Sequence, residues 1–242
     1  YKKDHYLQKI LGVFYGLIRR VFQLFLVPFY DGVYIFLNVS PVGPPILERI
    51  YLFLAKSCIY DIDDMVHHLR TSPANKLFSW LKSSNRYFIL LRNASHVITC
   101  TPELTRIANL YNLHATDISS TINTDSYVPV NLYTNDRPLS IGWTGSHSTV
   151  PYLHLLDDVF TRLACVYDFT LIVMGTESFT IPGVVVKAVP WSVANEVSTL
   201  QTMDIGVYPL PDDEWVKGKS GLKALQYMAL GLPVVASRVG CN

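Results

Sequence analysis

The chain has 242 residues, which is enough for one large domain or two of ordinary size, and half of them are hydrophobic. Only 16% are charged, and this composition excludes an intrinsically disordered protein. Residues 1–130 carry 13 basic and nine acidic side chains, whereas residues 131–242 carry seven and ten. The weakly basic first half suits an anionic membrane surface or acceptor, and without a basic stripe we expect no nucleic-acid partner.

Residues 10–30 are rich in apolar side chains and approach the roughly 20 residues of a membrane span. Arg19 and Arg20 would each cost roughly 2.5 to 3.5 kcal/mol at a membrane centre, so we do not expect a span. The segment fits either a helix packed on a sheet or an amphipathic helix giving residues 1–30 a peripheral membrane contact. On the second interpretation, lipid would meet Phe14, Leu17, Val21 and Leu24.

The arginine pair also breaks the apolar core that a secretory signal peptide needs. The four cysteines are widely scattered, with neither a C-x-x-C pair nor a histidine partner at metal-ligand spacing. We therefore expect a cytoplasmic protein whose thiols are buried and reduced, and the amphipathic interpretation of residues 1–30 would place it at the inner face of the membrane. These cysteines are Cys58, Cys100, Cys165 and Cys241.

The first half alternates strand-like and helix-like segments, which predicts a parallel sheet with helical crossovers. The predicted strands are residues 32–37, 58–62, 96–100 and 116–119, and the predicted helices are residues 46–57, 74–93 and 102–110. Residues 126–138 break every periodicity and contain two prolines and two asparagines. We therefore expect domains at 1–128 and 139–242, joined by a linker at 129–138.

The alternation then restarts, which predicts an α/β protein of two Rossmann-like domains facing a cleft. The predicted strands of the second half are residues 139–143, 169–174, 184–186, 204–208 and 233–236. Its predicted helices are residues 151–166 and 192–203 and a final helix that begins at Ser220.

The final strand–helix–strand unit, residues 204–237, contains the strongest candidate site. Ser220 is placed to cap the helix, and Gly231 is placed to end it. Lys219 and Lys223 are four residues apart, so we expect both ammonium groups beside the free N–H groups of the first turn. Solvated surface lysines are the alternative, but the surrounding unit favours an anion site for phosphate.

A glycine turn between a strand and a helix, GWTGSHST at 142–149, is the second candidate. Gly142 and Gly145 would let the backbone approach a ligand, and hydroxyls such as that of Ser146 could donate to phosphate or sugar oxygens. His147 could act as a general base if it faces the cleft. A purely structural turn is the alternative, because neither a dinucleotide fingerprint nor a P-loop lysine is present.

The acidic run YDIDD at 60–64 lies at the end of a predicted strand. Its carboxylates could hold a divalent cation or begin a phosphatase-like nucleophile site, but no second acidic cluster completes a metal shell. We prefer a cleft-lining role for Asp63 or Asp64, with helix capping as the alternative, and we predict no metal site. His67 and His68, which follow, are further candidate bases.

Several segments resemble retaining glycosyltransferases with the GT-B fold, close to family four. In the second half they are IGWTGSHSTVPYL, LIVMG, PW and the run from Asp204 to Ser237. In the first half they are SPVGPPILER, KSCIYDIDD, ASHVITCTPEL and TINTDSYVP. The resemblance implies an acceptor-side domain followed by a nucleotide-sugar domain.

The resemblance also implies transfer of a sugar from a nucleoside diphosphate donor to a glycan or lipid-linked acceptor, with retention and without metal or cofactor. Negative charge builds on the leaving diphosphate and needs positive or N–H partners. The implied diphosphate-binding residues are Gly145, Ser146, Lys219, Ser220 and Lys223. The implied nucleoside and ribose contacts are Trp191 and Gln226.

The chain departs from the family where two glutamates seven residues apart are usual, because Gly218 and Gln226 occupy those positions. Gln226 could still hydrogen-bond a ribose hydroxyl. The usual basic pair after the glycine turn is missing, as are the family's segments before Tyr1 and after Asn242, so we expect a fragment. A nucleotide-sugar epimerase and a non-catalytic partner subunit remain the alternatives.

Overall fold

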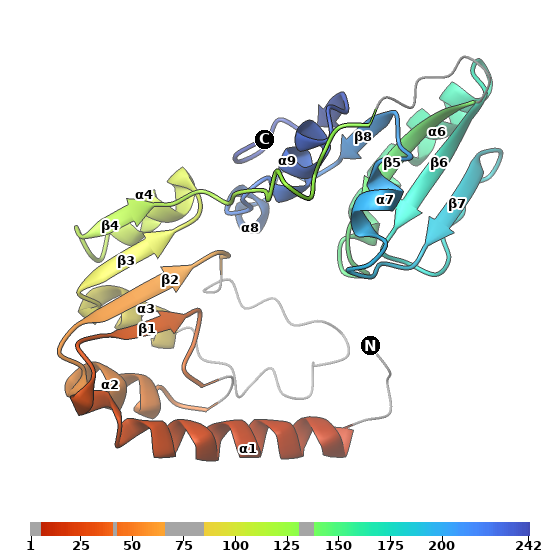
Figure 1. The fold of residues 1–242 in the computed structure, drawn as a ribbon. Helices are drawn as coiled ribbons and strands as arrows, with labels where there is room; N and C mark the ends of the chain where they lie inside the picture. Colours follow the sequence, from red (N-terminus) through yellow and green to blue (C-terminus); the bar gives the residue numbers. More distant parts are fainter. Residues whose placement is uncertain (1–5, 41–42, 66–84, 131–137) are drawn as a thin grey trace. The chain divides into compact units, whose positions relative to one another are not determined.

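The computed structural model describes residues 6–40, 43–65, 85–130 and 138–242 (Figure 1). The chain forms two compact units. The first comprises residues 1–119 with 218–220, and the second comprises residues 120–217 with 221–242. The predicted linker at 129–138 lies largely outside the described residues, and the predicted domain limits stay a prediction.

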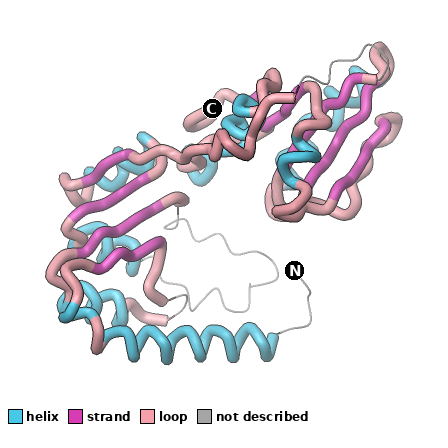
Figure 2. The backbone as a smooth tube through the Cα atoms, viewed as in Figure 1, coloured by secondary structure: helices cyan, strands magenta, loops and turns pink. Residues whose placement is uncertain are grey.

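The first unit is a parallel sheet of four strands in the order β1-β2-β3-β4 (Figure 2). The strands are β1 (Val33–Phe36), β2 (Cys58–Ile62), β3 (His96–Thr99) and β4 (Ala115–Asp117). The helices are α1 (Tyr6–Leu24), η1 (Val27–Phe29), α2 (Ile46–Leu54), α3 (Asn85–Asn93) and α4 (Pro102–Asn109). The predicted alternation is confirmed, while residues 74–84 of the predicted helix 74–93 lie outside the described residues.

A buried polar cluster fixes the segment that follows β1. Glu48 of α2 is completely buried, and its Oε1 accepts hydrogen bonds from the Ser40 backbone N–H at 3.0 Å and hydroxyl at 2.8 Å. Arg86 of α3, also buried, donates to the carbonyl oxygens of Ser40 and Gly43. Two charged side chains in the core are therefore retained by the backbone groups that they satisfy.

Helix α1 packs on one side and exposes apolar side chains on the other. The Tyr51 hydroxyl of α2 donates to the Arg20 carbonyl at 2.8 Å, which fixes the packed side. The exposed apolar residues of α1 are Ile10, Leu11, Phe14, Tyr15, Ile18, Val21 and Phe22, and Phe25, which follows the helix, is exposed as well. Leu17 and Leu24, expected to face lipid with Phe14 and Val21, are only partly exposed.

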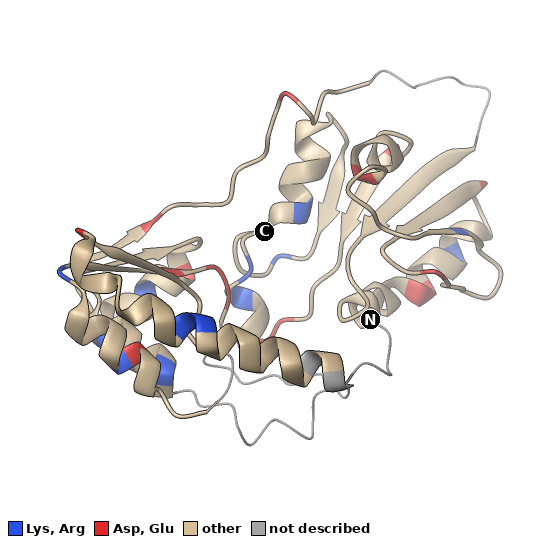
Figure 3. Ribbon diagram, turned by 60° about the horizontal axis from the view of Figure 1, so that its bottom comes forward, with Lys and Arg blue, Asp and Glu red and all other residues tan. Residues whose placement is uncertain are grey.

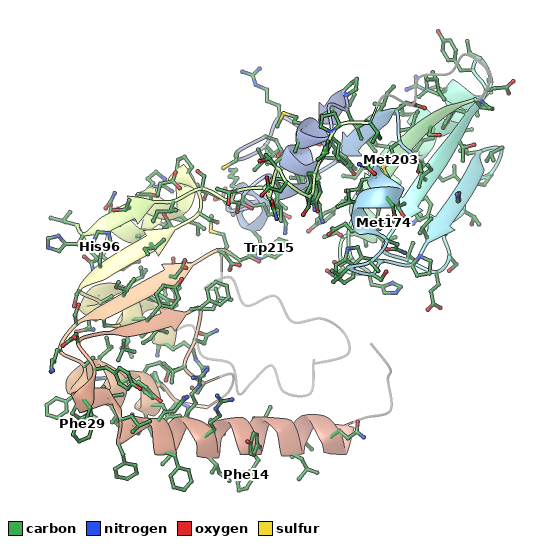
Figure 4. All side chains as sticks on the ribbon, in the orientation of Figure 1. Phe14, Phe29, His96, Met174, Met203 and Trp215 are labelled. Atoms are coloured by element: carbon green, nitrogen blue, oxygen red, sulfur yellow. The ribbon has the colours of Figure 1, made fainter. Side chains whose placement is uncertain are left out.

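Figure 4 shows Phe14 of α1 and Phe29 of η1 pointing away from the sheet. Figure 3 shows basic side chains on α1, which contains the exposed Arg19 and Arg20. Within the described ranges, no helix combines the length and hydrophobicity that crossing a membrane requires.

The second unit is a parallel sheet of five strands in the order β7-β6-β5-β8-β9. The strands are β5 (Leu139–Thr144), β6 (Phe169–Met174), β7 (Val185–Val189), β8 (Ile205–Tyr208) and β9 (Val234–Ala236). The helices are α5 (Val150–Leu153), η3 (His154–Leu156), α6 (Asp157–Ala164), α7 (Glu196–Leu200), α8 (Glu214–Lys217) and α9 (Leu222–Ala229).

Helices cover both faces of this second sheet. Leu171 and Val173 of β6 pack into a cluster with Phe160 of α6, whereas Ile172 and Met174 pack into another with Tyr227 of α9. Because successive side chains of a strand point to opposite faces, β6 is buried on both sides. This explains its unbroken apolar sequence.

Two predicted helices are wrong in length. The helix predicted at 151–166 is divided into α5, η3 and α6, and the His154 Nδ1–H donates a 2.8 Å hydrogen bond to the Asp157 carboxylate where α6 begins. The helix predicted at 192–203 is reduced to α7, because Ser192 and Asn195 bond each other's backbone N–H groups in a turn.

The prediction of four buried thiols is half wrong. Cys58 and Cys100 are buried, and burial raises the pKa of the Cys58 thiol to about 11. Cys165 and Cys241 are exposed. Cys165 follows α6 and Cys241 follows β9, and neither belongs to the two apolar clusters of the second unit.

Candidate functional site

The strand order of the second unit predicts where a ligand would bind. β5 and β8 are neighbours in the middle of the sheet, although β6 and β7 lie between them in sequence. From β5 the chain adds β6 and β7 on one side of the sheet, and it then returns to add β8 and β9 on the other side. In open parallel sheets, ligands bind beyond the carboxyl ends of the strands at such a point. The predicted glycine turn leaves β5 at this edge, and α9 follows β8.

The glycine turn is held by hydrogen bonds to α9, to β6 and within the turn itself. The Thr144 N–H donates to the Tyr227 hydroxyl at 2.9 Å, and the Gly145 N–H donates to the Met174 carbonyl at 3.1 Å. The Ser146 N–H donates to the Thr149 hydroxyl at 2.9 Å. The predicted Ser146 is exposed, so it remains accessible to a ligand.

Two glycines serve close packing around this turn. A Cβ at Gly142 would collide with the Met203 side chain, labelled in Figure 4, so this glycine serves the core. Gly175, which follows β6, has φ +110°, and a Cβ there would collide with the Gly145 carbonyl oxygen. Gly175 thus allows the β6 loop to lie directly against the turn after β5.

Helix α9 begins later than predicted. Its N-cap is Gly221 with φ +70°, and no side chain caps it, so Ser220 is not the cap. Lys219 precedes the helix and belongs to the segment 218–220 that groups with the first unit, whereas Lys223 belongs to the second. A diphosphate site shared by these lysines, with Ser220 beside them, therefore stays a prediction.

Lys223 is part of a polar cluster between α7 and α9. Its ammonium group donates to the Gln226 side-chain oxygen at 2.9 Å and lies 3.8 Å from Glu196 Oε1. The Gln226 amide nitrogen donates to the Tyr127 hydroxyl at 2.6 Å and to Glu196 Oε1 at 3.1 Å. The Trp191 side chain also lowers the pKa of the Glu196 carboxyl group. We call these five residues the Glu196 cluster.

The Glu196 cluster is partly shielded from water. Gln226 is 4% exposed, and the side chains of Glu196 and Lys223 are 18% and 26% exposed. Burial would raise the pKa of Glu196, but hydrogen bonds from Trp191 and Gln226 and the charge of Lys223 outweigh it and lower the pKa. Burial lowers the pKa of Lys223, and Glu196 opposes this shift. An ionised carboxylate therefore lies at this edge of the sheet.

The two predicted nucleoside contacts, Trp191 and Gln226, are thus brought together around one carboxylate. Sequence reasoning missed Glu196 and Tyr127, which take part in the same cluster. Their separation along the chain from Gln226 leaves no local pattern that could have indicated them.

A scan against protein-family models and a search of curated proteins both gave no match. Sucrose-phosphate synthase from Thermosynechococcus elongatus matches in structure at 14% identity and TM-score 0.56, over 87% of this chain and 57% of that protein. TarM matches at 13% identity and TM-score 0.60, over 91% of this chain and 44% of TarM. A glycosyltransferase from Rickettsia africae matches at 12% identity and TM-score 0.60, over 95% and 64%.

The chain has the GT-B fold. It spans between 44% and 64% of the length of these three proteins. At such low identity the likeness concerns the fold, and the predicted architecture of two Rossmann-like α/β units is confirmed.

The acidic run of the first GT-B unit lies at the carboxyl end of β2. Asp61 accepts a hydrogen bond from the Tyr34 hydroxyl, which raises the pKa of Tyr34 to about 12. Partial burial and the neighbouring Asp64 raise the pKa of Asp63, and Asp64 accepts from the Met65 N–H at 2.8 Å. Among the described residues, no group of three potential ligands could hold a metal ion.

Of the three histidines predicted as candidate bases, only His147 lies among the described residues. His147 is exposed in the turn after β5. His67 and His68 lie outside the described residues. Neither Asp63 nor Asp64 shares a unit with the Glu196 cluster. The catalytic assignments of His147, Asp63 and Asp64 therefore stay predictions.

Proposed function

We propose that this GT-B protein is a glycosyltransferase that moves a sugar from a nucleoside diphosphate donor to a glycan or lipid-linked acceptor, with retention. The Glu196 cluster is the observation that carries the proposal. It offers an exposed aromatic ring, a carboxylate and an ammonium group, which suit the base, the sugar hydroxyls and the phosphates of a nucleotide. A structure of TarM contains UDP, and one of starch synthase IV from Arabidopsis thaliana contains ADP and acarbose.

The proposed reaction needs no metal or cofactor, because protein groups can stabilise the leaving diphosphate. Lys219 and Lys223 would supply positive charge, and the N–H groups and hydroxyls near Gly145, Ser146 and Ser220 would supply hydrogen bonds. This stabilisation acts on charge that develops as the glycosidic bond breaks, so it accelerates the chemical step.

Donor turnover separates this proposal from its two alternatives. A panel of nucleotide sugars is first screened for thermal stabilisation of the chain, since a ligand that binds only the folded state raises its melting temperature. The stabilising donor is then incubated with and without glycan and lipid-linked acceptors. A transferase releases nucleoside diphosphate only with an acceptor, an epimerase changes the sugar without one, and a binding subunit changes nothing.

Lys219→Ala should weaken nucleoside diphosphate binding. The substitution removes a charge-assisted contact worth roughly 1.5 to 3 kcal/mol, equivalent to an increase in Kd of about 10- to 150-fold. Calorimetry measures the change, and Lys187→Ala, an exposed lysine in β7, is the matched control. Equal affinity of Lys219→Ala and the unaltered chain would remove Lys219 from the site.

We also propose that α1 contacts the inner face of an anionic membrane, with its exposed apolar residues toward lipid and its arginines near the headgroups. The chain should float with vesicles containing phosphatidylglycerol, and Phe22→Glu with Phe25→Glu should lower the bound fraction several-fold. Leu113→Glu, an exposed position after α4, is the control. Flotation that does not respond to the α1 substitutions would contradict this location.

A further inference from the structure

Trp191 and Glu196 form one recognition surface at the carboxyl edge of the second sheet. Trp191 follows β7, Glu196 begins α7, and the Trp191 side chain lowers the pKa of the Glu196 carboxyl group. Trp191 is 50% exposed, so one part of its ring is available to a flat apolar ligand. A nucleoside presents an aromatic base joined directly to a sugar with hydroxyl groups. Its base could therefore pack on Trp191 while its sugar lies within reach of Glu196.

The Gln226 amide has little capacity left for a ligand. Its nitrogen donates to Tyr127 and Glu196, and its oxygen accepts from Lys223. An amide group has two donors, and both are occupied here. Gln226 therefore holds its neighbours in place, and its buried position fixes the carboxylate of Glu196.

Glu196 retains acceptor capacity that its neighbours do not use. A carboxylate has about four lone-pair sites. Here Oε1 accepts one hydrogen bond, from the Gln226 amide at 3.1 Å, and the Lys223 ammonium group lies 3.8 Å from the same oxygen. Its side chain is 18% exposed, so a hydroxyl donor from a ligand can approach from solvent. The nearby Lys223 favours the ionised form, which only accepts hydrogen bonds.

We infer that Glu196 accepts a hydrogen bond from a ribose hydroxyl of the donor nucleotide, while Trp191 packs against the base. Gln226 is a positioning residue that holds the carboxylate. This inference rests on the proposed function, and it names the part of the donor that the Glu196 cluster recognises. It also reassigns the ribose contact predicted for Gln226 to a carboxylate on a different helix.

The test compares nucleotides with and without the ribose hydroxyls. UDP, ADP and GDP and their 2′,3′-dideoxy counterparts are titrated into the chain by calorimetry. The unaltered chain should bind at least one ribonucleotide about tenfold or more tightly than its dideoxy counterpart, the usual effect of a hydrogen bond to a charged group. Glu196→Gln should reduce this preference to about threefold or less by weakening only the ribonucleotide.

Asp168→Asn makes the same chemical change at the opposite, amino-terminal edge of β6, and it should leave the preference intact. Unchanged dideoxynucleotide affinity in Glu196→Gln also shows that the altered site is folded. If Glu196→Gln kept the preference for the ribonucleotide, or weakened the ribonucleotide and the dideoxynucleotide equally, the ribose contact assigned to Glu196 would be wrong, while the proposed function would stand. If the unaltered chain bound none of the six nucleotides, the proposed function would fall with it.

Discussion

Arg86→Leu is expected to destabilise the first unit by about 3 to 5 kcal/mol, the range for removing one partner from a buried charged cluster. Arg86 is 4% exposed and donates to the carbonyl oxygens of Ser40 and Gly43. Leucine would leave these carbonyls without their donor. The completely buried Glu48 carboxylate would also lose the positive charge that its cluster contains.

Hydrogen exchange along a urea series would measure this loss in the first unit separately from the second. Peptides covering β1 and β2 should exchange at clearly lower urea concentrations in Arg86→Leu. The matched control is Arg92→Leu, an exposed arginine of the same helix whose guanidinium lies 5.2 Å from the centre of the Tyr111 ring. The control should cost about 1 kcal/mol or less. Equal effects of the two substitutions would show that the buried cluster contributes little.

Gly175→Ala is expected to cost the second unit about 3 to 5 kcal/mol, because backbone strain and overpacking act together. Gly175 has φ +110°, which side chains rarely adopt, and its new Cβ would collide with the Gly145 carbonyl oxygen. Relief of the collision must displace the turn after β5, which is part of the proposed diphosphate site. Nucleoside diphosphate binding should therefore weaken as well.

Gly183→Ala isolates the backbone strain from the collision. Gly183 has φ +76°, but nothing lies within 4 Å of the position where its Cβ would be. We expect this control to cost about 1 kcal/mol and to leave nucleotide affinity unchanged. Urea unfolding followed by tryptophan fluorescence reports mainly on the second unit, which contains three of the four tryptophans, namely Trp143, Trp191 and Trp215. Similar losses for both substitutions would mean that the contact with Gly145 is unimportant.

The sequence predicts the strands of both units well, because their apolar residues are contiguous or alternate within a few positions. β6 is an example, since burial on both faces requires an unbroken apolar run. The helices were predicted less accurately where side chains compete for the backbone. Ser192 and Asn195 form a turn at the place where apolar periodicity predicted helix.

The candidate site could be predicted only where its residues are close in sequence. The turn after β5 and the start of α9 carry local signals, namely glycines and lysines. Glu196 joins Gln226 through the packing of α7 beside α9, and Arg86 joins Glu48 at Ser40 through the packing of α2 and α3. Such contacts depend on the tertiary arrangement of helices, which the apolar pattern of a single sequence does not specify.

The central claim is that the second unit binds a nucleotide sugar at the Glu196 cluster, and photoaffinity labelling tests it most directly. The chain is irradiated with 5-azido-UDP-glucose or 8-azido-ADP-glucose, and the labelled peptides are identified by mass spectrometry. We predict labelling within residues 190–196 or 222–229 that excess unmodified nucleotide sugar abolishes. Labelling confined to residues 6–119, or labelling that the competitor does not reduce, would contradict the claim.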